Sequence, residues 1–126
     1  MPPSSISLTL PIPPSTNAIW RCQGRRMRKS KLYRQWCTMC DIVSLQDTVP
    51  RPRYTRPVSV EIVIRSGHGW RRGRDIDNIA KPIIDWLVSW QIIENDDWSI
   101  VQHVSISLDT LPRAAACVDV TVRCRD

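Results

Sequence analysis

The chain has 126 residues, of which 42% are hydrophobic and 24% charged, and its formal net charge is +6. This length favours one domain over residues 1–126. No apolar run approaches the ~20 residues of a membrane-spanning helix, and no basic stretch followed by an apolar one marks a secretory signal at the N-terminus. We expect a cytoplasmic protein with no membrane partner, and the positive charge favours a polyanion, nucleic acid first.

Charge of both signs is segregated along the chain. Seven basic residues and no acidic one lie between Arg21 and Arg34, whereas six acidic residues and Lys81 alone as a base lie between Asp75 and Asp97. A protein that needed charge only for solubility would intersperse the two signs. The pattern therefore predicts a basic surface and a separate acidic site.

The first third of the chain predicts a strand, a basic segment and a helix. Residues 6–10 alternate apolar and polar side chains, as a half-buried strand does, and the prolines of residues 11–15 end it. The basic segment of residues 20–28 is compatible with a loop or a short hairpin. Ser30 is a plausible N-cap for a helix ending near Leu45. Helical spacing places these side chains on its inner face: Leu32, Trp36, Met39, Cys40 and Val43.

The middle of the chain predicts a connector, a strand and a second helix. Residues 48–57 contain three prolines and three arginines, typical of an extended connector. Val58, Val60, Ile62 and Ile64 alternate with other residues and predict a strand with these four side chains inward. A loop is expected from Ser66. A helix capped by Asp77 or Asn78 then runs to about Trp90, with an inner face of Ile79, Ile83 and Leu87.

The last third predicts a turn and two strands. Residues 94–97 are typical of a turn, and a strand is expected to start at Ile100, with Val104, Ile106 and Leu108 alternating along it. The final strand has Val118, Val120 and Val122 inward, and residues 111–116 are the expected connection. The predicted order is β, α, β, α, β, β.

The five cysteines include one Cys-x-x-Cys pair, Cys37 and Cys40. In a cytosol the default is reduced thiols. A zinc site would need a second such pair or paired histidines, and the sequence has neither. We therefore interpret these residues as buried or half-buried helix cysteines.

Two aspartates flank Ile76 just before the second predicted helix. In an extended segment, residues i and i+2 project to the same side, so Asp75 and Asp77 would converge while Ile76 points into the core. Asp96 and Asp97 follow that helix. If the strand after them pairs with the strand before Asp75, a third carboxylate can join the first two.

Crowded carboxylates repel one another, and a hard divalent cation such as Mg²⁺ removes this penalty. Such an ion can activate water for attack on phosphorus. Lys81, one turn after Asp77, could neutralise the transition state. The alternative is a solvated turn in which one aspartate only caps the helix. Asp85 fits an ion pair with Lys81 at i,i+4.

Three stretches carry a family resemblance: "LTLPIPPSTN" (residues 8–17), "RDIDNIAKPIIDWL" (residues 74–87) and "IIENDDWSIV" (residues 92–101). Their order and spacing resemble the RusA family of Holliday junction resolvases, small dimeric Mg²⁺-dependent endonucleases of phage and bacteria. The most specific part is D-x-D-N-x-x-K-x-x-x-D. The family usually has a glycine before the apolar pair that leads to Asp97, where this chain has Ser89, Trp90 and Gln91.

The resemblance implies an α+β fold, a single small domain with a mixed β-sheet of about four or five strands packed with two helices. It places the catalytic group on Asp75, Asp77, Lys81 and Asp97, with the three aspartates as ligands of Mg²⁺ (or Mn²⁺) and Asn78 supporting them. Asp96 is the alternative third ligand. Basic residues that would contact DNA are Arg21, Arg25, Arg26, Arg28, Lys29, Lys31, Arg71, Arg72 and Arg74.

The implied partners are four-way or branched DNA and a second copy of the chain, with no small-molecule cofactor. The implied setting is a bacterial or phage-infected cell. Two further interpretations remain open. One is a non-catalytic nucleic-acid-binding protein in which the acidic cluster only balances charge, and the other is a metal nuclease of this fold that acts on other branched DNA.

Overall fold

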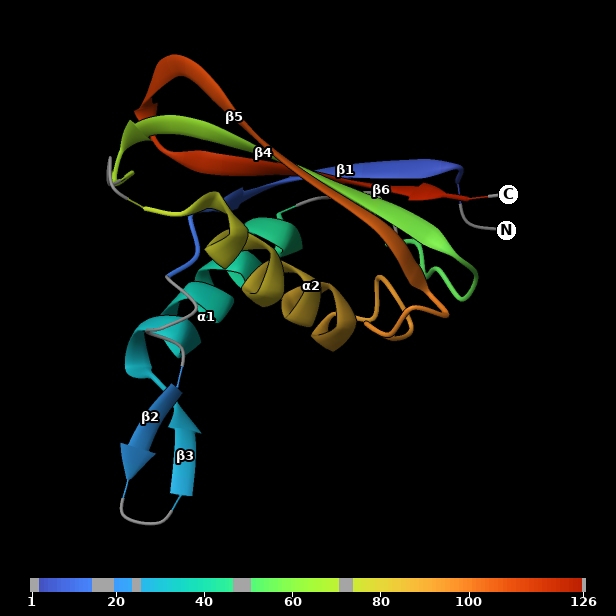
Figure 1. The fold of residues 1–126 in the computed structure, drawn as a ribbon, viewed down its shortest axis with the longest axis horizontal. Coiled ribbons are helices and arrows are strands. Elements are labelled where there is room, and N and C mark those ends of the chain that lie inside the picture. Colours follow the sequence, from blue (N-terminus) through green and yellow to red (C-terminus); the bar gives the residue numbers. More distant parts are fainter. Residues whose placement is uncertain (1–2, 15–19, 24–25, 47–50, 71–73, 126) are drawn as a thin grey trace.

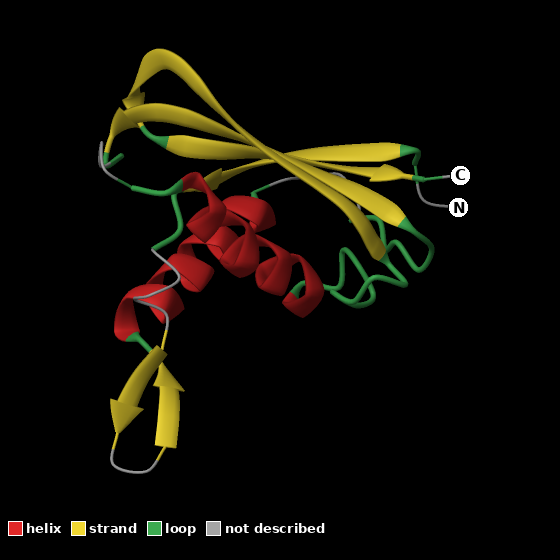
Figure 2. Cartoon of the chain, viewed as in Figure 1, coloured by secondary structure: helices red, strands yellow, loops and turns green. Residues whose placement is uncertain are grey.

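The computed structural model describes residues 3–14, 20–23, 26–46, 51–70 and 74–125. Both α-helices lie on one face of a four-stranded sheet of order β1-β6-β4-β5, and β2 and β3 form a separate hairpin (Figure 1, Figure 2). The elements are β1 (Ser5–Pro11), β2 (Trp20–Gln23), β3 (Arg26–Lys29), α1 (Lys31–Leu45), β4 (Val58–His68), the 3₁₀ helix η2 (Ile76–Ile79), α2 (Ala80–Ser89), β5 (Val101–Ala115) and β6 (Cys117–Cys124). The predicted α+β class is confirmed.

The sheet is mixed because β4 lies between an antiparallel and a parallel neighbour. It pairs antiparallel with β6, which pairs antiparallel with β1, and it pairs parallel with β5. Alternation puts one side chain in two on the helix side, and the predicted inward residues of β4 and β6 are fully buried: Val58, Val60, Ile62, Ile64, Val118, Val120 and Val122. The other face is polar, with Thr9 Oγ1 donating to Asp119 Oδ1 at 2.8 Å.

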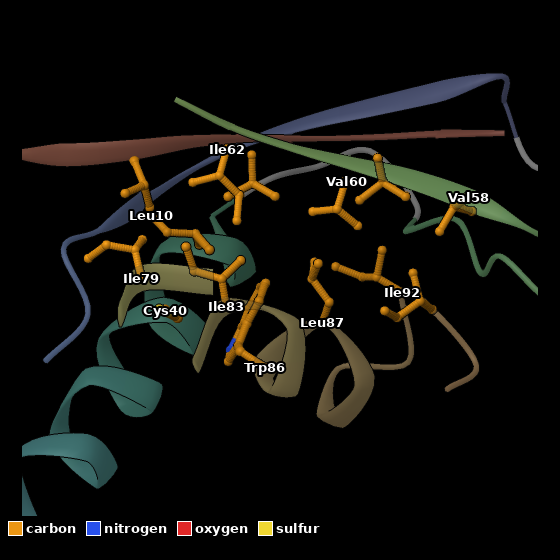
Figure 3. Packing of buried hydrophobic residues seen from close by; sticks show 14 of the residues in the cluster. Leu10, Cys40, Val58, Val60, Ile62, Ile79, Ile83, Trp86, Leu87 and Ile92 are labelled. Atoms are coloured by element: carbon orange, nitrogen blue, oxygen red, sulfur yellow. The ribbon is translucent and has the colours of Figure 1, made fainter. Parts of the chain in front are cut away.

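The core lies between this sheet and the helices (Figure 3). Ile79, Ile83 and Leu87 are fully buried and face β4, as their spacing predicts. Trp86 is 1% exposed, and its indole Nε1 donates to Asp41 Oδ1 of α1 at 2.9 Å. The hydrogen bond satisfies the polar end of a large buried ring, and it ties the two helices together beneath the sheet.

Helix α1 starts where expected but does not bury the predicted face. Ser30 caps it, because its Oγ accepts a hydrogen bond from the backbone N–H of Tyr33 at 3.2 Å. Tyr33, Trp36 and Cys40 form the buried face, at spacings i, i+3 and i+7. The prediction was wrong for three side chains, since Leu32, Met39 and Val43 are 58%, 50% and 43% exposed.

The cysteine interpretation agrees with this burial. Cys37 is half-buried, Cys40 is fully buried, and both are free thiols. Burial raises the pKa of the Cys40 thiol well above its usual range, because a thiolate would be poorly solvated there. Cys40 is therefore a core residue of α1.

Two strands run further than their sequences predict. Strand β4 includes residues 66–68, where a loop was expected, and β5 extends to Ala115, through most of the expected connection. The extra pairing of His68 with Ala115 needs register shifts on either side of Gly67. Such irregularities let paired strands bend together, and the ends of β4 and β5 arch over the sheet in Figure 1.

The basic segment before α1 is a hairpin, one of the two predicted forms. Trp20 pairs with Lys29 and Cys22 with Met27 across β2 and β3. The hairpin extends from the N-terminal end of α1, away from the sheet (Figure 1). This position makes it an arm of the domain.

Candidate active site

The paired aspartates precede α2, but their local structure differs from the prediction. Asp75 is extended (φ −74°, ψ 135°) and Asp77 lies in the first turn of η2. Neither Asp77 nor Asn78 caps α2, because η2 intervenes and α2 starts only at Ala80. Residues 76–79 form a 3₁₀ turn rather than an extended segment, so the alternation of side chains that placed Ile76 inward does not apply, and Ile79 enters the core instead.

Burial confirms this correction. Ile79 is 0% exposed, whereas Ile76, the expected anchor, is 41% exposed. The anchor thus lies immediately before α2, and Asp75 and Asp77 are both at the surface. Among the described residues, none donates a hydrogen bond or forms an ion pair with either carboxylate. Two such carboxylates at a helix start remain available to a cation or a solvent-borne ligand.

Lys81 lies one turn further on and contacts two carboxylates. Its Nζ is 2.9 Å from Asp85 Oδ1, the predicted i,i+4 pair, and 3.5 Å from Asp96 Oδ2. The hydrogen bond to Asp85, followed by the charges of Asp85 and Asp96, raises the pKa of Lys81 above its usual value. Lys81 is therefore a cation throughout the neutral range.

Asp97 has a different environment from its neighbour Asp96. Its Oδ1 accepts hydrogen bonds from the backbone N–H of Ser99 at 2.9 Å and from the Ser99 hydroxyl, and its Oδ2 accepts one from Asn95 Nδ2 at 3.0 Å. These bonds shape the turn that leads into β5. The structure brings Asp96, the alternative third ligand, to Lys81, and leaves Asp97 bonded within its own turn.

No group of three His, Cys, Asp or Glu residues close enough to hold a metal occurs in the part of the chain that the structure describes. The expected strand pairing is present, but it is parallel, so Val101 lies opposite Val58 at the start of β4. Asp97 lies just before β5, near the beginning of β4, whereas Asp75 follows the end of β4. Mg²⁺ commonly takes one or two protein carboxylates plus water and phosphate oxygens, and Asp75 and Asp77 fit that set.

The turn after α2 is built on a residue with positive φ. Gln91 has φ 60°, and the backbone N–H of Ile92 closes the helix end by donating to Leu87 O at 2.9 Å. The connector pairs with the same turn, since buried Tyr54 donates its N–H to Ile92 O at 2.7 Å and accepts from Glu94 N at 3.0 Å. The glycine that the family usually has in this stretch fits such a turn, because glycine adopts positive φ without steric cost.

We therefore expect Gln91→Gly to be more stable than Gln91→Ala by about 1 kcal/mol. Both variants lose the hydrogen bond from Arg53 Nη1 to Gln91 Oε1, so their difference isolates the backbone conformation. Urea unfolding of the two variants gives this difference. Equal midpoints would show that the positive φ carries no strain.

The predicted DNA-contacting residues occupy two parts of the molecule. Arg21, Arg26, Arg28 and Lys29 belong to the strands of the hairpin, and Lys31 is exposed at the start of α1. Arg74 is half-buried with its guanidinium 5.6 Å from the centroid of the Trp70 ring. Arg25, Arg71 and Arg72 lie outside the described residues.

The site consists of two exposed carboxylates followed by a lysine, at the start of a helix that packs under a mixed sheet. These features are typical of a small nuclease with an acidic centre. The family model of endodeoxyribonuclease RusA matches residues 11–123. The chain belongs to this family of Holliday junction resolvases and is a nuclease that acts on DNA. No curated protein matches the chain in a sequence search. None of the helices in the described residues is long and apolar enough to cross a membrane.

Proposed function

We propose that the protein is a Mg²⁺-dependent endonuclease that resolves Holliday junctions by paired, symmetric cleavage during DNA recombination and repair in a bacterial or phage-infected cell. The observation that carries the proposal is a pair of exposed carboxylates, Asp75 and Asp77, which have no partner among the described residues. Lys81 follows the second of them by one helical turn. Mn²⁺ has similar ligand preferences and is the expected substitute.

Each residue of the site has a proposed role. Asp75 and Asp77 hold the metal, and Asn78 supports their segment. Asp97, the third ligand that the resemblance implies, would have to leave the hydrogen bonds of its own turn to join them. Bound Mg²⁺ supplies a Lewis acid that lowers the pKa of water and stabilises charge on phosphate oxygens. Lys81 places a permanent positive charge where negative charge develops on the phosphate.

The basic residues have a binding role in this proposal. The hairpin and the segment before Asp75 contact phosphates, so junction affinity falls steeply as salt rises. Contacts of this kind fix the position of the duplex without reading its sequence. Junction preference then comes from the shape of the DNA.

A homodimer suits the substrate, because a four-way junction has near two-fold symmetry and a C₂ dimer presents two equivalent sites. Helix α1 supports this assembly, since five of its large apolar side chains are 43–72% exposed: Leu32, Met39, Ile42, Val43 and Leu45. Exposed apolar patches of this kind mark interaction surfaces.

The charges of α1 favour a second α1 as the occupant of this surface. The helix has Lys31 and Arg34 in its first turn but no acidic residue there, and no basic residue in its last turn. The helix dipole is positive at the N-terminus, so the cations there are unfavourable, and no basic residue compensates its negative C-terminal end. An antiparallel copy would place these cations beside the negative C-terminal end of the partner helix.

Met39→Glu is therefore expected to convert the dimer into a monomer. An unpaired charge buried between two helices weakens association by about 100- to 1,000-fold. Gel filtration with light scattering measures the mass of each variant. Leu111→Glu on β5 is the matched control, because Leu111 is 75% exposed on another element, and it should remain dimeric. A dimeric Met39→Glu variant together with a dimeric wild type would exclude α1 as the interface.

The function itself is tested with a four-way junction labelled on two opposed strands. We expect both strands to be cut in the presence of Mg²⁺ and neither in its absence. A non-catalytic nucleic-acid-binding protein would bind the junction without cutting it. Faster cleavage of a flap or three-way junction would instead identify a nuclease for other branched DNA.

A further inference from the structure

Trp98 is the most exposed large hydrophobic residue in the described part of the chain, at 81%. It follows Asp97 directly in the turn between α2 and β5. Tryptophan is mostly buried in folded proteins, and it is enriched where one side of the ring meets a binding partner. An indole left this open next to the candidate active site requires an explanation.

Four other tryptophans have side chains that the structure describes, and all are buried or half-buried: Trp36, Trp70, Trp86 and Trp90. Trp36 and Trp86 are buried, and each indole N–H has an acceptor, the backbone oxygen of Pro11 and a carboxylate of Asp41. Trp90 stacks on Trp86 at 5.1 Å and has Arg51 3.9 Å from its ring centroid. Trp98 makes no ring contact and no hydrogen bond with any described residue. Its position is therefore not explained by packing against the described residues.

The turn holds Trp98 in place from both sides. Asp97 Oδ1 accepts from the backbone N–H and the hydroxyl of Ser99, and Asn95 Nδ2 donates to Asp97 Oδ2. The backbone oxygen of Asp97 also accepts from the N–H of Val101 at 2.9 Å. Hydrogen bonds that span a residue fix its backbone, so the position of the Trp98 Cβ is set before binding and only the side-chain torsions remain to be ordered.

The same turn connects Trp98 to the candidate catalytic lysine. Asp96 Oδ2 lies 3.5 Å from Lys81 Nζ, and only Asp97 separates Asp96 from Trp98. The indole is thus two residues along the turn from the carboxylate that contacts Lys81. A ligand group that reaches Trp98 while a phosphate lies near Lys81 has to extend from the phosphate by a short distance, as a nucleobase does.

We infer that Trp98 is a stacking platform for an exposed nucleobase at the branch point, next to the phosphate that is cut. This inference rests on the proposed function. Every base has a π-face, so stacking on an aromatic ring is tolerant of sequence. In a linear duplex the faces of internal base pairs are covered by their neighbours, whereas a branch point interrupts stacking and exposes them. Trp98 therefore contributes to the preference for branched over linear DNA.

The test uses Trp98→Ala and Trp98→Phe with a four-way junction and a linear duplex of the same length. Loss of one base–aromatic stack predicts that Trp98→Ala binds the junction about 5- to 150-fold more weakly than the wild type. Binding to the linear duplex should be unchanged. Trp98→Phe keeps an aromatic face and should retain most of the junction affinity.

Tryptophan emission gives a direct readout of contact. Junction binding should quench the emission of the wild type, and the quenching should be smaller in Trp98→Phe by the contribution of this ring. Equal loss of junction and linear duplex affinity in Trp98→Ala would overturn the inference. A change of oligomeric state in Trp98→Ala would also overturn it, because the ring would then belong to a protein interface.

The two proposals fail in different ways. If the wild type neither binds nor cuts a four-way junction, the proposed function is wrong. If the wild type cuts junctions and Trp98→Ala binds them as tightly as the wild type does, the function stands and the role of Trp98 is rejected.

Discussion

Asp75→Asn is expected to remove junction cleavage and leave junction binding intact. The change keeps the shape of the side chain but removes a charged oxygen that would hold the metal. Metal ions supply several kcal/mol of transition-state stabilisation, so we expect a rate loss of about 100- to 1,000-fold. Asp75 is exposed and has no partner among the described residues. Its substitution should therefore change the free energy of unfolding by less than about 0.5 kcal/mol.

The measurement is a single-turnover cleavage assay beside a gel-shift assay of the same junction. Glu61→Gln is the matched control, since Glu61 is an exposed carboxylate on the polar face of β4 and the net charge changes equally. It should cut like the wild type. An Asp75→Asn variant that also cut at the wild-type rate would remove Asp75 from the site.

The regular part of the fold could be predicted because burial imposes a short period on the sequence. The alternating residues of β4 and β6 are buried as expected. Helix α1 shows where this reasoning ends. Its sequence has two overlapping apolar faces. The face with Tyr33 packs against β1 and α2, whereas Met39 on the other face is exposed. Periodicity identifies a helix but not which face another element will cover.

The candidate site was predictable in position and less so in geometry. The motif located Asp75, Asp77 and Lys81 before and in α2. The contact between Lys81 and Asp96 depends on how a surface turn folds back, which no local pattern encodes. The parallel pairing of β4 with β5 is likewise a long-range choice. It explains why a third carboxylate does not join the first two among the described residues.

Lys81→Ala is expected to bind the junction and to cut it about 100-fold more slowly, the usual effect of removing one group that stabilises developing charge. The hydrogen bond to Asp85 raises the pKa of Lys81, so the folded state favours the charged form. The ion pair therefore stabilises the protein at neutral pH, and the effect is lost only as pH rises through the folded-state pKa. A base that must be neutral would need the opposite shift, so the raised pKa favours the proposed role of Lys81 as a cation.

This assignment separates Lys81→Arg from Lys81→Ala. Arginine keeps the charge and should retain more cleavage than alanine, whereas a general base could not be replaced by arginine, which stays protonated. Asp85→Asn tests the positioning of the cation, because it weakens the contact that holds Nζ at 2.9 Å and leaves the proposed metal ligands unchanged. It should lower the cleavage rate less than Lys81→Ala does. Loss of junction binding in Lys81→Ala would instead make Lys81 a binding residue, since catalysis and binding would fail together.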